Sequence, residues 1–308
     1  MTPRHDPPPQ HAEELVLEKL SGFSDVHVWP QTTKLNPYAW LDNFTPKERP
    51  YAIALLNAFL YFNEPMVDAM FSACVRSLGA LVTAREDTFC DARKTWGQFL
   101  DNLYVTHVEG ENPNPTDSGY IFARKARQVL GLTEEHILHP REAVQRINDT
   151  PHKNLLFVDD FVGSGNQITE TWCRHYGATG APSVCFAELA KEQKGRYFYT
   201  PLVCTAKGFE NATRGCPGLN IHPAHLIDER YNLLNPRCVF WPQALRSTAV
   251  AVLFEASRRA GIVKHYKYSW QGFHNLGLGL AFWHSVPDAT LPIFFWDTPD
   301  WHPLVRRV

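Results

Sequence analysis

The chain has 308 residues, of which 44% are hydrophobic and 13% aromatic, so it has the composition of a folded globular protein rather than a disordered one. Its formal net charge is −2 and no long basic run occurs, so composition gives no indication of direct nucleic-acid binding. The seven cysteines are an odd number without a Cys-x-x-Cys pair, which favours buried free thiols over disulfides or a structural zinc site.

The expected location is the cytoplasm. The first ten residues, MTPRHDPPPQ, lack the apolar core of a signal peptide. The apolar stretches elsewhere are too short to span a bilayer, so no membrane partner is expected.

Residues 1–100 are predicted to form a Pro-rich tail and a helical region. Helices are expected over residues 12–20, 46–62, 65–81 and 91–100. The clearest start is Thr45-Pro46-Lys47-Glu48, which offers a threonine N-cap, a proline at the first helical position and a glutamate three residues on.

Residues 101–308 are predicted to form an α/β domain. Strands are expected over residues 103–108, 154–158, 183–189 and 199–206, and helices over residues 120–130, 167–176 and 242–261. This alternation predicts right-handed crossovers and a parallel sheet flanked by helices. The aromatic and Pro-rich residues 266–308 are expected to pack back over this domain.

The segment LLFVDDFVGSGNQ carries the main functional signal. An apolar strand is followed by Asp159 and Asp160, two apolar residues and a small-residue loop that opens a helix. Ligands of open α/β sheets bind beyond the carboxyl ends of the strands. Amides at the helix start can bind a phosphate, whereas the carboxylates suit ribose hydroxyls or a magnesium ion held by ligand oxygens. The candidate phosphate-binding residues are Gly163, Ser164, Gly165, Asn166 and Gln167.

The loop is neither a Walker loop nor a Gly-x-Gly-x-x-Gly turn. It resembles the signature of type I phosphoribosyltransferases. The resemblance implies that Asp159 and Asp160 act at the ribose and its reacting bond, while Gly163–Gln167 bind the 5-phosphate. Gln167 stands where that family usually has threonine, so a hydroxyl contact is lost and amide contacts remain. The alternative interpretation is a helix-capping Asp-Gly turn that binds nothing.

The resemblance extends along most of the chain to phosphoribosyltransferase-like proteins of bacterial conflict and anti-phage systems. The strings that carry it are WLDNFTPKERPYAIALLNAFLYFNE, TDSGYIFARKAR, FVDDFVGSGNQ, AKGFENATRGCP and LGLGLAFWHSVPDATLPIFFW. It implies a defence effector that acts on nucleotides or related sugar phosphates. Some members of this family sit beside sensor or reverse transcriptase genes, which implies a partner protein of that kind.

Two further groups are candidates for ligand binding. Ser118 and Gly119 begin a predicted helix whose amides could meet a pyrophosphate, with Arg124 two turns in; an ordinary N-cap is the alternative. Lys207 and Arg214 follow a strand end, and the guanidinium of Arg214 suits a phosphate. A solvated charged face is the alternative there.

No metal ligands are assigned from the sequence. His222, His225 and Asp228 have helical spacing, but surface or capping roles are preferred to a metal site. The tryptophans between residues 270 and 301 could stack on a base, although a core role is favoured by their density.

The sequence therefore predicts an effector that binds a nucleotide or phosphoribosyl diphosphate and acts on its C1 bond by transfer or hydrolysis. Magnesium would arrive with a ligand pyrophosphate. The alternative is a catalytically silent nucleotide- or RNA-binding module that docks a sensor complex.

Overall fold

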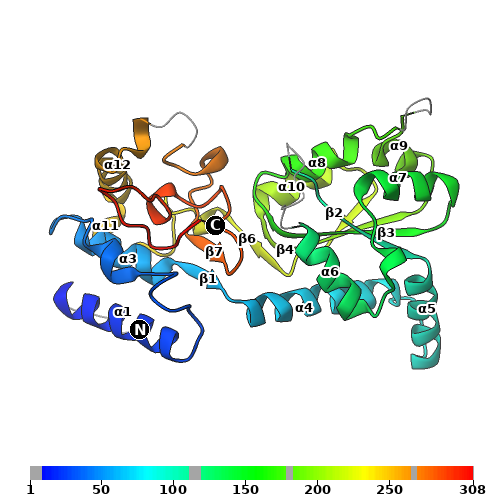
Figure 1. The fold of residues 1–308 in the computed structure, drawn as a ribbon, viewed down its shortest axis with the longest axis horizontal. Coiled ribbons are helices and arrows are strands. Elements are labelled where there is room, and N and C mark those ends of the chain that lie inside the picture. Colours follow the sequence, from blue (N-terminus) through cyan, green and yellow to red (C-terminus); the bar gives the residue numbers. More distant parts are fainter. Residues whose placement is uncertain (1–8, 111–118, 178–182, 265–268, 308) are drawn as a thin grey trace. The chain divides into compact units, whose positions relative to one another are not determined.

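The computed structural model describes residues 9–110, 119–177, 183–264 and 269–307, and the chain divides into two compact units (Figure 1). Unit 1 combines residues up to Glu64 with residues from Glu229 onward, and unit 2 spans Pro65–Asp228. The boundary predicted at residue 100 falls inside unit 2.

A parallel sheet forms the centre of unit 2. Its strands are β2 (Leu103–His107), β3 (Asn154–Val162), β4 (Arg196–Thr205) and β5 (Leu219–Ile221), in that order. A further strand, β6 (His225–Ile227), pairs with the carboxyl end of β4. All of these pairings are parallel, which confirms the predicted α/β class. β2 ends opposite Val158, whereas β3 and β4 continue together to Val162 and Cys204.

One face of this sheet is covered by four helices. They are α7 (Pro140–Asp149), α8 (Asn166–Cys173), α9 (Phe186–Lys191) and α10 (Ala206–Gly215). Their buried side chains meet the alternate strand residues Leu155, Phe157, Tyr197 and Tyr199 in one core. Trp172 of α8 lies edge-on to Tyr197, with ring centroids 5.1 Å apart.

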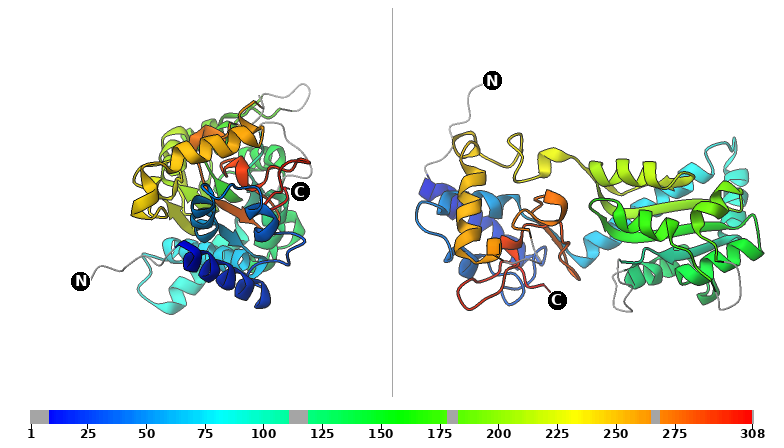
Figure 2. Two further views of the ribbon diagram at one scale, coloured as in Figure 1. Left: turned by 90° about the vertical axis from the view of Figure 1, so that its left-hand side faces the viewer. Right: turned by 90° about the horizontal axis from the view of Figure 1, so that it is seen from above.

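The other face carries three helices, and the sequence assigned the first two of them to a separate region (Figure 2). They are α4 (Glu64–Val82), α5 (Phe89–Asp101) and α6 (Gly119–Leu130). Phe71 of α4 contacts Phe122 of α6 at 6.4 Å, and Phe99 of α5 lies edge-on to Phe198 of β4 at 5.4 Å. Because these contacts join α4 and α5 to the sheet, these two helices belong to unit 2 and not to a separate N-terminal region.

Of the described helices, α4 alone is long and apolar enough to cross a membrane by length and composition. Its apolar stripe, which includes Val67, Phe71 and Leu78, is buried in the fold. A stripe buried on one side is typical of an amphipathic helix that packs against a sheet.

Unit 1 is built from both ends of the chain. Its helices and strands are α1 (Pro9–Asp25), α2 (Pro37–Leu41), α3 (Arg49–Ala58), β1 (Leu60–Phe62), α11 (Gln243–Arg246), α12 (Ala249–Arg259) and β7 (Leu280–Phe282). β1 and β7 pair in parallel. Trp40 stacks on Phe294 at 5.6 Å and donates to the carbonyl of Ile293, and Trp301 is buried beside them. The aromatic C-terminal segment therefore packs with the N-terminal helices rather than over the sheet.

Short 3-10 helices complete the described structure: η1 (Glu134–His136), η2 (Glu229–Tyr231), η3 (Ile262–Lys264), η4 (Phe273–Asn275) and η5 (Pro292–Phe294).

Three predicted elements are wrong. The strand expected over residues 183–189 is the start of α9, because Cys185 and Glu188 form a capping box at its N-terminus. The helix expected over residues 46–62 ends at Ala58, and the chain continues as β1 because β7 pairs with it. The helix expected over residues 242–261 is divided into α11 and α12.

Candidate functional site

The acidic doublet lies inside strand β3, near its carboxyl end. Asp159 and Asp160 are the first β3 residues beyond the end of β2, since His107 pairs with Val158. The two side chains lie close to one another, because a side-chain hydrogen bond and a charge interaction both join Asp159 to Asp160. Both residues are only 7% exposed. The doublet is thus a buried feature at the rim where parallel sheets bind ligands.

Asp159 is held by two hydrogen bonds. Tyr199 donates its hydroxyl to Oδ2 at 2.9 Å, and the Asp160 N–H donates to Oδ1 at 2.9 Å. Burial raises the pKa of the Asp159 carboxyl well above its usual range, and the negative charge of Asp160 raises it further. The charged form of Asp159 is therefore disfavoured until a ligand donates to it.

The loop Gly163–Gly165 is oriented through its carbonyl groups. Thr205 donates its hydroxyl to the Gly163 carbonyl at 2.5 Å, and Asn211 donates its amide to the Ser164 carbonyl at 3.0 Å. Both partners lie at or on α10. A trans peptide points its N–H opposite to its C=O, so the N–H groups of Ser164 and Gly165 face away from α10.

The amides at the start of α8 continue this arrangement. Gly165 is its N-cap, and Thr169 donates both its N–H and its hydroxyl to the Gly165 carbonyl. The Asn166 N–H meets the Ser164 hydroxyl at 3.3 Å. Among the described residues, the N–H groups of Ser164, Gly165 and Gln167 donate to no other residue. A helix start with unpaired amides is a ready site for an anion.

Glycine is required in the loop because α10 lies so close to it. Gly165 has a φ of +82°, and an added Cβ would lie 2.7 Å from the Gly208 carbonyl oxygen. A Cβ at Gly208 would in turn lie 2.5 Å from the Gly163 carbonyl oxygen. Side chains at either position would push α10 from the loop and disturb its carbonyl contacts.

The predicted cations on α10 lie on its outer side. Lys207 is exposed, and Arg214 is 71% exposed in its side chain and pairs with Glu210 at 2.7 Å. Arg214 also lines an open cleft of about 370 Å³ between α8 and α10, with Asn166, Thr169, Glu170, Asn211 and Gly215. Asn166 connects this cleft to the loop at the start of α8.

The second predicted ligand group lies at the start of α6. Ser118 is outside the described residues. Gly119 is buried so tightly that a Cβ would lie 2.6 Å from the His107 Cβ, and Arg124 is exposed on α6. His107 is a buried strand histidine whose ring lies 4.3 Å from that of Tyr120.

A buried carboxylate network lies just past β2, and sequence reasoning missed it. The Glu109 side chain is only 4% exposed and accepts from Arg174 Nη1 at 2.7 Å and from the Tyr176 hydroxyl. His139 Nε2 lies 3.3 Å from its other oxygen, and the Glu109 N–H donates to Thr171. Burial and the hydrogen bond to Glu109 raise the pKa of Tyr176. Since its charge is paired with Arg174, Glu109 repels a nearby phosphate less than an unpaired carboxylate would.

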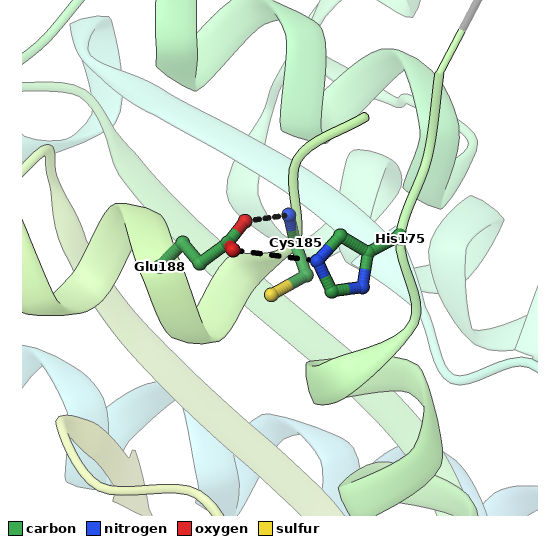
Figure 3. Close-up of side chains that lie close together, drawn as sticks. All are labelled: His175, Cys185 and Glu188. Atoms are coloured by element: carbon green, nitrogen blue, oxygen red, sulfur yellow. Dashed lines mark hydrogen bonds and ion pairs between the residues drawn. The ribbon is translucent and has the colours of Figure 1, made fainter. Parts of the chain in front are cut away.

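A group of potential metal ligands was also not predicted from the sequence. His175, Cys185 and Glu188 place their ligand atoms within 4.8 Å of one another (Figure 3). His222, His225 and Asp228 do not gather in this way within the described part of the chain.

Comparison with known families agrees with the fold. No curated protein matches the chain. The sequence model of the PRTase-CE family matches residues 37–307, which extend over parts of both units and include the doublet, the loop and the aromatic C-terminal segment. The chain therefore belongs to the PRTase-CE family and is a phosphoribosyltransferase-like protein.

Proposed function

We propose that the chain binds a ribose 5-phosphate, as a nucleotide or phosphoribosyl diphosphate, and acts on the C1 bond by transfer or hydrolysis. The orientation of the Gly163–Gln167 loop carries this proposal. Its carbonyls are taken up by Thr205, Asn211 and Thr169, which leaves amides at the start of α8 for a phosphate.

The doublet would bind the sugar beyond that phosphate. Ribose hydroxyls would donate to Asp159 and Asp160, which favours the charged carboxylates that burial otherwise disfavours. As the C1 bond breaks, the leaving group takes the bonding electrons and the ribose ring gains positive charge. Two nearby carboxylates stabilise that charge, as they do in glycoside hydrolysis. An acceptor or a water oxygen then bonds to C1.

Magnesium fits this donor set, because carboxylate and phosphate oxygens are its preferred ligands. A diphosphate ligand would bring the ion, and Asp159 or Asp160 would orient it through oxygen. Lys207 and Arg214 of α10 would lie on the solvent side of the site. Arg214, which lines the cleft, is the first of the two to test for phosphate binding.

We further propose that the biological role is that of an effector in a bacterial anti-phage system, working with a sensor or reverse transcriptase complex in the cytoplasm. The support is the resemblance of the chain to proteins of such systems. The second candidate is a binding module without turnover. Gln167 favours this binding module, because position 167 at the start of α8 carries no threonine hydroxyl for a phosphate.

The test is base release by the purified chain. A nucleotide panel and phosphoribosyl diphosphate with Mg²⁺ are incubated with the protein, and products are separated by chromatography. Calorimetry with ribose 5-phosphate measures binding. The double variant Asp159→Asn, Asp160→Asn should lose turnover, whereas the exposed carboxylate variant Asp149→Asn should keep it.

Binding without base release in the wild type supports the module instead. Turnover that is equal in the wild type and in the doublet variant would contradict the assignment of the site.

A further inference from the structure

A short antiparallel contact brings two chain segments of unit 2 together. Tyr176 and Val184 exchange backbone hydrogen bonds of 2.9 and 3.1 Å. In this register, His175 and Cys185 are the next facing pair, and such pairs hold their Cβ atoms close together. His175 follows α8 and Cys185 is the N-cap of α9, so this contact places an imidazole beside a thiol.

The cap of α9 adds a carboxylate to this pair. Glu188 is three residues after Cys185, and its Oε2 accepts from the Cys185 N–H at 3.1 Å. Its other oxygen, Oε1, lies 3.3 Å from His175 Nε2. The carboxylate is therefore fixed by the backbone through one oxygen and presents the other to the imidazole, as Figure 3 shows.

The spacing of these atoms suits a small tetrahedral ion. With Zn–N and Zn–O bonds of about 2.0–2.1 Å and a Zn–S bond of about 2.3 Å, neighbouring ligands lie roughly 3.3–3.6 Å apart. The His175–Glu188 separation of 3.3 Å already matches this value. All ligand atoms lie within 4.8 Å, so the sulfur needs to move by on the order of 1 Å, which a side-chain torsion provides.

The donor set selects the metal. A thiolate and an imidazole favour Zn²⁺, whereas Mg²⁺ and Ca²⁺ prefer oxygen ligands alone. The Cys185 residue is 3% exposed, while the side chains of His175 and Glu188 are about half exposed. A metal has access from the exposed side, and a water can fill the fourth position there.

We propose that His175, Cys185 and Glu188 bind Zn²⁺ together with one water, and that the ion joins the end of α8 to the start of α9. Binding replaces the thiol proton with a sulfur–zinc bond and replaces the His175–Glu188 hydrogen bond with two bonds to the ion. This site is independent of the ribose-phosphate proposal, because it uses none of the same side chains.

The test uses Co²⁺ as a spectroscopic probe and Zn²⁺ as its competitor. Metal-free protein should bind Co²⁺ with a thiolate-to-metal charge-transfer band, and Zn²⁺ should displace it at a ratio of one ion to each chain. In Cys185→Ser the band should disappear and Zn²⁺ affinity should fall by more than about tenfold. Serine remains a good N-cap, so this variant should keep α9.

The matched control is Cys173→Ser, because Cys173 is an exposed thiol two residues before His175. It should bind both metals as the wild type does. His175→Gln should weaken Zn²⁺ binding while keeping a polar side chain. Added Zn²⁺ should raise the melting temperature of the wild type and of Cys173→Ser, but not of Cys185→Ser. The absence of a band in the wild type, or its survival in Cys185→Ser, would overturn the proposal and leave these residues as a helix cap.

Discussion

Replacing Arg174 by methionine would strand the buried carboxylate of Glu109. The pair is 2.7 Å apart, with side-chain exposures of 26% for Arg174 and 4% for Glu109. Breaking a buried ion pair costs about 3–5 kcal/mol. Tyr176 and His139 remain next to the carboxylate, so we expect a smaller loss of about 2–3 kcal/mol in the free energy of unfolding. For a unit of this size, that loss lowers the melting temperature by about 5–10 °C.

The assay is urea unfolding followed by circular dichroism, with thermal melting as a second measurement. Arg214→Met is the control, because its ion pair with Glu210 is exposed and should contribute less than about 0.5 kcal/mol. Adding Glu109→Gln to Arg174→Met removes the stranded charge and should restore at least about 1 kcal/mol. The reasoning is refuted if Arg174→Met is as mild as the control, or if the double variant is no more stable than Arg174→Met.

Three further predictions concern the doublet and the loop. Burial beside a second carboxylate raises the pKa of Asp159, so the wild type loses stability as the pH rises through that pKa. Asp159→Asn should therefore raise the urea midpoint at pH 8, and this gain should vanish in acid. A gain that does not depend on pH would show that the charge of Asp159 is not its cause. Gly165→Ala should lower the free energy of unfolding in urea by more than about 1 kcal/mol, because φ is +82° and the new Cβ would lie 2.7 Å from a carbonyl oxygen of α10. The control Gly97→Ala, in open space on α5, should be neutral or stabilising. Thr205→Val removes the donor to the Gly163 carbonyl and should weaken ribose 5-phosphate binding by about tenfold in calorimetry, while Thr205→Ser should keep it; equal affinities would show that this hydrogen bond does not orient the loop.

Local patterns were sufficient for the sheet and the loop. The apolar run Leu155–Val158 and the β-branched residues near Val105 are buried on both faces, which is what a parallel sheet requires of its strands. The glycines of the loop could also be recognised from the sequence, because the backbone conformation that glycine permits is a property of the single residue.

Long-range contacts account for what the sequence did not predict. The partners of Glu109 could not be predicted from the sequence, because Arg174 and Tyr176 are 65 and 67 residues away from it. The end of α3 and the start of β1 depend on β7, near the other end of the chain. The wrong strand at residues 183–189 has a local cause: SVCFAEL is apolar enough for a strand, and the capping pair of Cys185 and Glu188 outweighs that pattern.

The pairing of β1 with β7 has a consequence for how the protein is made. The ribosome synthesises the helices α2 and α3 first, and their partners around Phe294 and Trp301 follow only after the whole of unit 2. Residues Pro65–Asp228 are complete earlier and can fold as a separate body while the nascent chain is still growing. During that interval, the apolar side chains of α2 and α3 have no native cover, so this early segment is the part of the chain that a ribosome-associated chaperone would most need to shield.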